Sequence, residues 1–288
     1  MTAMTNDPII RQLTRDELDT VVGWAEAEGW NPAASDADAF WAQDPHGFWG
    51  AELDGRLVGS ASAVAYGDSY GFWGLFIVVP ELRGRRIGSL LARTTIAGLQ
   101  ARLAPGAAIE LDGVPDQQDY YRSLGFAYGH RDVRMRGTAD AEEPEHDVVP
   151  LTSLPFEQVV AYDAAVFGTA RPGFLARWIA RPDGVAVGVV DGGRLTGIGA
   201  VRRCVDGAKI GPLFADDDAT AESLYRALAG HVAGGPIHLD VPETRPGAVA
   251  LAARHGLTEV FSCARMRLGG EVATQWDRVY GVTTFELG

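Results

Sequence analysis

The spacing of apolar residues along the first half of the chain predicts alternating helices and strands. Apolar residues recur every three or four positions over residues 14–29, which predicts a helix. Segments 47–54 and 56–67 alternate around Asp54 and Gly55, a pair typical of a two-residue hairpin turn. The same patterns give further helices at 36–43, 87–101 and 116–125, and further strands at 71–79, 107–113 and 128–137. Strands followed by a strand-helix alternation predict a mixed sheet with helices on both faces.

This pattern occurs twice. The stretch LTRDELDTVV from Leu13 aligns with LTSLPFEQVV from Leu151, 138 positions later. Further along, Gly125 of YYRSLGF aligns with Gly256 of LAARHGL, 131 positions later, so the second copy has lost about seven residues in between. Self-similarity over this length predicts two homologous halves.

We expect the halves to be two domains. They span residues 1–138 and 148–288, and the segment 137–149 between them is acidic and contains a proline, as a solvated linker does. A chain of 288 residues suits two domains of roughly 100 to 200 residues each.

Charge and cysteine content narrow the classes of partner. A net charge of -13 argues against nucleic acid or an anionic membrane surface. Cys204 and Cys263 are too few for a disulfide framework, and neither they nor the six histidines show metal-ligand spacing, so we predict no metal. Because no signal peptide or membrane-spanning run is recognisable, we expect a cytoplasmic protein. We expect it to be a monomer or a homodimer.

Residues 77–92, IVVPELRGRRIGSLLA, join a predicted strand to a predicted helix through a basic loop. The loop supplies two glycines and three arginines: Gly84, Gly88, Arg83, Arg85 and Arg86. Glycines let the backbone approach a ligand, arginines donate to phosphate oxygens, and a helix start presents unpaired N–H groups. The loop therefore predicts a pyrophosphate site, the alternative being a turn with solvated arginines.

The second copy favours the pyrophosphate site over the turn. Its corresponding segment, ADDDATAESLY, has no glycine and carries Asp216, Asp217 and Asp218 in place of the arginines. Acids cap a helix start but repel phosphate. We therefore expect one active half and one structural half.

The run IVVPELRGRRIGSLL resembles the acetyl-CoA signature of the GNAT N-acetyltransferases, Arg/Gln-x-x-Gly-x-Gly/Ala. Arg83 and Gly88 match its ends, and Arg86 stands where the middle glycine is usual. The segment YYRSLGF, residues 120–126, resembles the Tyr-x-x-x-Gly-Phe segment of the same family, and EGWNP and KIGPLFADD look typical of one group of bacterial two-domain members. The resemblance implies an α/β fold of two tandem GNAT-like domains, each a mostly antiparallel twisted sheet with helices on both faces, of which the N-terminal one is catalytic and the C-terminal one is degenerate.

The resemblance also implies direct transfer of an acetyl group from acetyl-CoA to an amine. It assigns the pantetheine arm to the backbone of Ile77, Val78 and Val79, and the pyrophosphate to Arg83, Gly84, Arg85, Arg86, Ile87, Gly88 and Ser89. It makes Tyr121 the acid that protonates the departing thiolate. The second copy has Ala252 at that place, so the fold does not demand a tyrosine there.

The reaction needs a neutral amine, yet an aliphatic amine with a pKa near 10 is only about one part in a thousand neutral at pH 7. A base or a water relay must therefore collect its proton. The candidate bases are Asp112, Glu110 and, third, Asp68. Asp112 ends a strand expected beside the cofactor, but Asp240 occupies the same point of the second copy, so an aspartate there also suits a purely structural role.

The acceptor pocket is expected near EGWNP, where we assign Trp30 and Asn31, together with Glu110, to substrate binding. Lys209 either faces the cleft between the halves or lies on the surface. The leading hypothesis is an N-acetyltransferase for a small-molecule amine, and the negative net charge suits a cationic one. The alternatives are a protein N-acetyltransferase and a non-catalytic acyl-CoA-binding sensor or interaction module.

Overall fold

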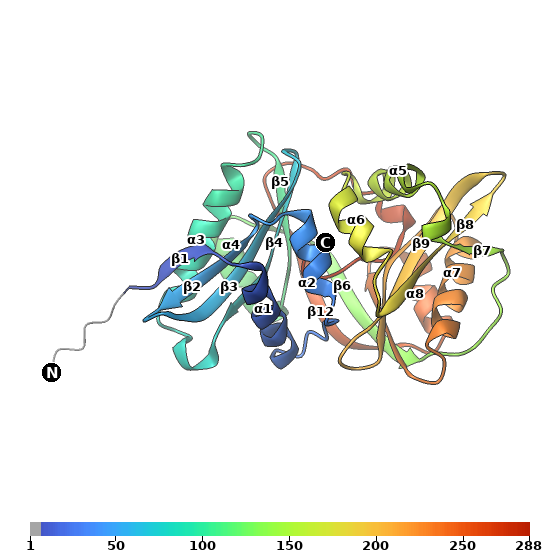
Figure 1. Ribbon diagram of the computed structural model, residues 1–288, viewed down its shortest axis with the longest axis horizontal. Helices are drawn as coiled ribbons and strands as arrows, with labels where there is room; N and C mark the ends of the chain where they lie inside the picture. Colours follow the sequence, from blue (N-terminus) through green and yellow to red (C-terminus); the bar gives the residue numbers. More distant parts are fainter. Residues whose placement is uncertain (1–6) are drawn as a thin grey trace.

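The computed structural model describes residues 7–288, which form one thirteen-stranded sheet with helices packed on it (Figure 1). The strands are β1 (Ile9–Gln12), β2 (Phe48–Leu53), β3 (Arg56–Tyr66), β4 (Tyr70–Val78), β5 (Ala108–Gly113), β6 (Ala127–Thr138), β7 (Val148–Pro150), β8 (Gly184–Asp191), β9 (Arg194–Arg203), β10 (Ala208–Ala215), β11 (Pro236–Pro242), β12 (Thr258–Leu268) and β13 (Val279–Gly281). The α-helices are α1 (Arg15–Ala27), α2 (Asp36–Gln43), α3 (Ile87–Gln100), α4 (Gln118–Ser123), α5 (Phe156–Phe167), α6 (Pro172–Trp178), α7 (Asp218–His231) and α8 (Pro246–Arg254). No helix within this range is both long and apolar enough to cross a bilayer.

Local sequence accounts for the element boundaries, and the predicted elements of the first half are confirmed to within two residues, apart from a 3-10 turn that opens the 116–125 segment. Thr14 caps α1 in a reciprocal arrangement with Glu17, in which each side chain meets the other's backbone N–H. Asp54 and Gly55 both adopt positive φ angles, 51° and 76°, as a tight hairpin turn between β2 and β3 requires.

Helices cover both faces of the first half, as expected. Successive strand residues point to opposite faces. On β4, Phe72 therefore packs in one apolar cluster with α1 residues such as Leu18, while its neighbour Trp73 packs in another with α3 residues such as Leu91. The indole N–H of Trp73 also donates to the hydroxyl of Thr95 on α3 at 2.9 Å.

The two halves exchange their last strands. The strand order is β1-β2-β3-β4-β5-β12-β6-β11-β10-β9-β8-β7, so β12 of the second half pairs with β5 of the first, and β6 of the first pairs with β11 of the second. Neighbouring strands are antiparallel except for β4–β5 and β10–β11. The segment 128–137 is the strand we predicted, but it completes the sheet of the other half. Two sequence repeats are thus joined into one sheet.

In each half, two parallel strands pair briefly and then diverge. Strand β4 pairs with β5 only from Tyr70 to Phe72, and β10 pairs with β11 only from Ala208 to Ile210. In the second half the gap is occupied by β13, which pairs with β10, and the N–H of Val282 that follows it donates to a β11 carbonyl. No strand among the described residues fills the corresponding gap in the first half.

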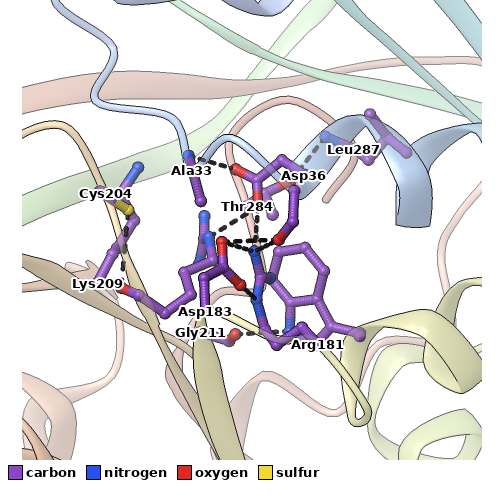
Figure 2. A network of polar contacts seen from close by, with 12 residues as sticks. Ala33, Asp36, Arg181, Asp183, Cys204, Lys209, Gly211, Thr284 and Leu287 are labelled. Carbon is purple, nitrogen blue, oxygen red and sulfur yellow. Dashed lines mark hydrogen bonds and ion pairs between the residues drawn. The ribbon is translucent and has the colours of Figure 1, made fainter. Parts of the chain in front are cut away.

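The halves also meet through buried ion pairs. Asp36 on α2 lies 3.0 Å from Arg181 and 3.1 Å from Arg202, both of the second half, and Arg181 also pairs with Asp183 at 2.6 Å. Figure 2 shows Asp36 pointing toward Arg181 and Asp183, with Lys209 beside them. Burial alone would raise the pKa of Asp36, but Arg202 and Arg181 together lower it below its ordinary value. Because Asp36 is the acid with which Arg202 pairs, a neutral residue in its place would leave Arg202 buried without that partner.

After β13 the chain enters the first half. This C-terminal segment, residues 282–288, is buried throughout, and Figure 1 shows its end between the two halves. The hydroxyl of Tyr66 on β3 donates to the carbonyl of Leu287 at 2.7 Å, and Arg171 of the second half donates to the hydroxyl of Thr283 at 2.9 Å. The segment is therefore held from both halves.

Candidate active site

A cavity of about 590 Å³ occupies the gap between β4 and β5. Ten of the predicted site residues line it: Trp30, Ile77, Val78, Arg83, Gly84, Arg86, Gly88, Ser89, Asp112 and Tyr121. Five do not: Asn31, Val79, Arg85, Ile87 and Glu110. The first group joins the basic loop to the diverging strands and α4, so one space connects the predicted cofactor and reaction regions.

At one end of the cavity the start of α3 is open. Arg86 precedes the helix in the left-handed conformation (φ 67°), and no side chain of the described residues caps it. Arg86 thus takes the backbone shape that glycine adopts most readily. A Cβ on Gly88 would lie 3.1 Å from the Phe76 ring, so glycine keeps this face of the helix close to β4. The unpaired N–H groups and the positive helix end can receive an anion.

The matching helix of the second half is closed. Asp217 precedes α7, and its carboxylate accepts a hydrogen bond from the N–H of Thr220 at 2.8 Å. The neighbouring Asp218 accepts hydrogen bonds from Arg245 and from the hydroxyl of Tyr280 on β13. The acids that replace the arginines thus satisfy this helix internally and bind the strand that fills the gap.

Arg83 connects the loop to α1. Its Nε donates to the carbonyl of Val78 at 2.8 Å, and its guanidinium forms an ion pair with Glu28. The N–H of Val79 donates to the carbonyl of Val58 on β3 at 3.0 Å. The carbonyl of Val78 belongs to the same peptide unit and points the opposite way, so it lies on the edge of β4 that faces the cavity. Ile87, the first residue of α3, is 3% exposed and packs in the core.

Tyr121 stands on α4 at the side of the cavity. Its ring packs so closely on β5 that a Cβ at Gly113 would lie 2.2 Å from it, and it meets Trp73 edge to face with ring centroids 6.1 Å apart. Burial raises the pKa of Tyr121, so its hydroxyl keeps a proton at neutral pH and can donate it. The matching Ala252 is a fully buried core residue of α8.

Asp112 lines the cavity, but both of its carboxylate oxygens accept hydrogen bonds from Arg265 on β12, each at 2.7 Å. Burial and the nearby charge of Asp132 raise the pKa of Asp112, against the opposing effect of Arg265. Glu110 accepts from Arg265 at 3.2 Å and from the hydroxyl of Tyr70 at 3.1 Å. Both acids therefore join β5 to the exchanged strand.

Trp30 and Asn31 have different surroundings. The carbonyl of Trp30 accepts hydrogen bonds from Arg134 at 2.7 Å and from the Lys209 ammonium at 3.3 Å. The Asn31 side chain instead donates to the backbone carbonyl of Asp206 at 3.0 Å and accepts from the backbone N–H of Asp206 at 2.7 Å. Asn31 thus connects the two halves. Lys209 is 1% exposed, and burial lowers its pKa, so the surface position considered above is wrong.

Sequence reasoning missed the part of the cavity wall that comes from beyond residue 126. These residues are Arg134 on β6, Phe261 and Cys263 on β12, and Phe285 and Glu286 of the C-terminal segment. One signal was present: VTTFELG, after the end of the second repeat, carries three large apolar residues and a single acid.

Within residues 7–288, one trio of acidic and histidine side chains lies close enough to share an ion: Glu142, Glu222 and His255. Glu222 already accepts hydrogen bonds from Arg254 at 2.8 Å and Arg226 at 2.9 Å. Two guanidinium groups on the central acid satisfy its charge, so the trio is accounted for as an ion-pair network.

Comparison with known proteins agrees with this fold. Residues 10–126 match the model of the acetyltransferase (GNAT) family, and residues 159–281 match a second model described as an acetyltransferase (GNAT) domain. Holothin acyltransferase of a Pseudoalteromonas species is 27% identical over 275 residues, covering 95% of this chain and 92% of that protein.

Solved structures share the whole architecture. A putative acetyltransferase from Pyrococcus horikoshii superposes with a TM-score of 0.84 at 24% identity, covering 100% of this chain and 98% of that one. A tandem GNAT protein from the clavulanic acid biosynthesis pathway superposes with a TM-score of 0.65 at 15% identity, covering 92% and 99%. The chain therefore belongs to the GNAT acetyltransferases and carries two domains of that family in tandem.

Proposed function

We propose that this protein transfers an acetyl group from acetyl-CoA to the primary amine of a small molecule, by direct attack while both substrates are bound. The cavity between β4 and β5 carries the proposal, because it runs from an open, basic helix start to a buried aromatic and acidic chamber. The equivalent gap of the second half is closed by β13 and by Asp217. One cofactor site per chain follows, in the first half.

The cavity suits each part of the donor. The phosphates would lie against the N–H groups at Gly88 and Ser89, with the Arg86 guanidinium beside them. Arg83, which is paired with Glu28, and Arg85, which lies outside the cavity lining, would add positive charge nearby. The pantetheine arm would run along the β4 edge that β5 leaves unpaired, where the Val78 carbonyl lies. A β4 N–H in this stretch would meet the thioester oxygen as negative charge develops on it.

The leaving thiolate requires a proton, and Tyr121 is the side chain we assign to supply it. Its ring is fixed by Gly113 and Trp73, and its raised pKa keeps it protonated over the neutral range. A positioned proton donor of this kind contributes roughly 10²- to 10⁴-fold to a rate.

The walls favour a small acceptor over a protein. Beyond the donor site the cavity is bounded by the second half and by the C-terminal segment, so an acceptor must fit between Trp30, Phe261 and Phe285. The full-length relative named holothin acyltransferase also supports a small-molecule acceptor. We propose that Trp30 contacts that acceptor.

The test measures thiol release from acetyl-CoA against a panel of small amines and lysine peptides. We expect turnover with at least one small amine and a rise in melting temperature with acetyl-CoA. Turnover on peptides alone would make the protein a protein N-acetyltransferase. Stabilisation by acetyl-CoA without turnover on any amine would make it an acyl-CoA sensor.

A further inference from the structure

We propose that Glu286, carried by the C-terminal segment, is the catalytic carboxylate that binds the acceptor's ammonium group and takes its proton. The inference rests on the proposed acetyl transfer to an amine. It assigns the base to a residue that belongs to neither copy of the repeat.

In the described part of the chain three carboxyl groups line the cavity: Glu28, Asp112 and Glu286. Glu28 is in an ion pair with Arg83, and both oxygens of Asp112 accept from Arg265. Glu286 is 4% exposed, and its Oε2 is buried with no hydrogen-bond partner among residues 7–288. A buried carboxylate oxygen without a donor is costly, so Glu286 is the acid of the three that calls for a donor from a ligand.

Glu286 also lies at the right point along the donor path. Its backbone carbonyl would be 2.4 Å from a Cβ on Gly74, so only the missing side chain lets the segment lie against β4. Gly74 is four residues before Val78, about 13 Å at the rise of a strand, measured away from the phosphate loop. This is where β4 leaves β5, and hence where the far end of the pantetheine arm would arrive.

The proton donor and the proposed proton acceptor flank this point from opposite faces of the sheet. Tyr121 packs on Trp73 in the cluster beneath α3. Phe285, next to Glu286, packs in the cluster beneath α1. A thioester in the gap would therefore have the acid on one side and the carboxylate on the other, as attack by the amine and departure of the thiolate require.

Glu286 is held in place and its charge is balanced. On either side of it, Thr283 is bonded by Arg171, and Leu287 by Tyr66 and by Thr284. Three cations on three strands interact with Glu286: Arg134 on β6, Arg202 on β9 and Lys209 on β10. Asp240 on β11 pairs with Arg134. The three cations interact favourably with a negative Glu286, which offsets the cost of burying it.

In the proposed step the acceptor's ammonium group gives one proton to Glu286, and the neutral nitrogen then attacks the thioester carbonyl carbon. The C–N bond forms, the C–S bond breaks, and Tyr121 protonates the thiolate. The second nitrogen proton returns to Tyr121, and Glu286 releases its proton to solvent, leaving an amide, a free thiol and one proton.

The shape of a pH profile tests this step. With an alkylamine of pKa near 10, the wild-type kcat/KM should be nearly flat from pH 6.5 to 9, because the enzyme binds the abundant ammonium form. Glu286→Gln should use only the free amine, so its kcat/KM should rise about tenfold per pH unit and lie roughly 10³-fold below wild type at pH 7. With an arylamine that is already neutral, the two should differ only a few-fold.

Glu271→Gln changes an exposed acid that follows β12 and does not line the cavity, so it serves as the matched control. Equal slopes for wild type and Glu286→Gln would overturn the proposal, as would an equal loss with both amines. If Glu286 had only a structural role, Glu286→Gln would lower kcat/KM at every pH without changing its dependence on pH.

A measurement without turnover separates this proposal from the proposed function. In CoA-loaded protein, calorimetric titration of the alkylammonium should give a dissociation constant at least tenfold weaker for Glu286→Gln than for wild type. Equal affinities would overturn the role of Glu286 even if the enzyme acetylates amines. Weakened binding in a protein that releases no thiol would support the ammonium site while refuting acetyl transfer.

Discussion

The backbone of Arg86 is strained, while its side chain is proposed to contact the phosphates of acetyl-CoA. Replacing Arg86 with glycine should therefore stabilise the protein and weaken acetyl-CoA binding. Its φ of 67° lies in the left-handed region, which costs a residue with a Cβ roughly 1–2 kcal/mol. Glycine removes that strain but adds about 0.5–1 kcal/mol of chain entropy to the unfolded state. We therefore expect Arg86→Gly to raise the free energy of unfolding by about 0.5–1 kcal/mol.

The same change should weaken acetyl-CoA binding. A hydrogen bond from a guanidinium to an anion contributes roughly 1.5–3 kcal/mol, and the exposed position of Arg86 favours the lower end. About 1.4 kcal/mol corresponds to tenfold in the dissociation constant, so we expect a loss of about tenfold at low salt. The loss should shrink as salt screens the contact.

Denaturant unfolding without ligand and calorimetric titration with acetyl-CoA measure the two effects separately. Arg86→Lys is the matched control, since it keeps the charge and the strained backbone, and it should change stability little. If Arg86→Gly bound acetyl-CoA as tightly as wild type, Arg86 would not be a phosphate ligand. If it were less stable than wild type, the argument from backbone strain would be wrong.

Three further changes test the cavity. Gly88→Asp should abolish acetyl-CoA binding, whereas Asp217→Gly should leave it unchanged and cost only a few tenths of a kcal/mol of stability; titrations of both variants decide, and unaltered binding in Gly88→Asp would remove the loop from the site. Tyr121→Phe should lower kcat roughly 10²- to 10⁴-fold with little change in acetyl-CoA affinity, and undiminished turnover would exclude Tyr121 as the acid. Asp112→Asn breaks a buried pair with Arg265 and should cost about 3 kcal/mol in urea unfolding; unchanged stability with lost activity would instead favour Asp112 as the base.

Features fixed by a few neighbouring residues could be predicted from the sequence. The basic loop, the hairpin at Asp54 and Gly55 and the acid-capped start of α7 each depend on residues within one turn of chain. The loop also keeps a left-handed backbone at Arg86, although this position has no glycine.

Pairing between distant strands could not be predicted in this way. The segments RDVRMRG in β6 and SCARMRL in β12 present nearly the same pattern, so either can pair beside β5, and local sequence does not choose between them. The C-terminal segment has no counterpart in the first repeat, so comparison of the two copies gave no reason to place Glu286 in the cavity.

The exchange of β6 and β12 also sets the order in which the protein can mature during synthesis. Strand β5 is made early, but the strand that pairs with its open edge ends 130 residues after β6 does. At roughly 5–20 residues per second, a ribosome takes about 7 to 26 s to cover that distance. During this delay the edge of β5 lacks the strand that covers it in the folded protein, so it is open to pairing with β6, with another chain or with a chaperone. The part of the cavity wall that comes from β12 and the C-terminal segment can therefore form only after the second half has been translated, so the cavity of the first half is completed late in synthesis.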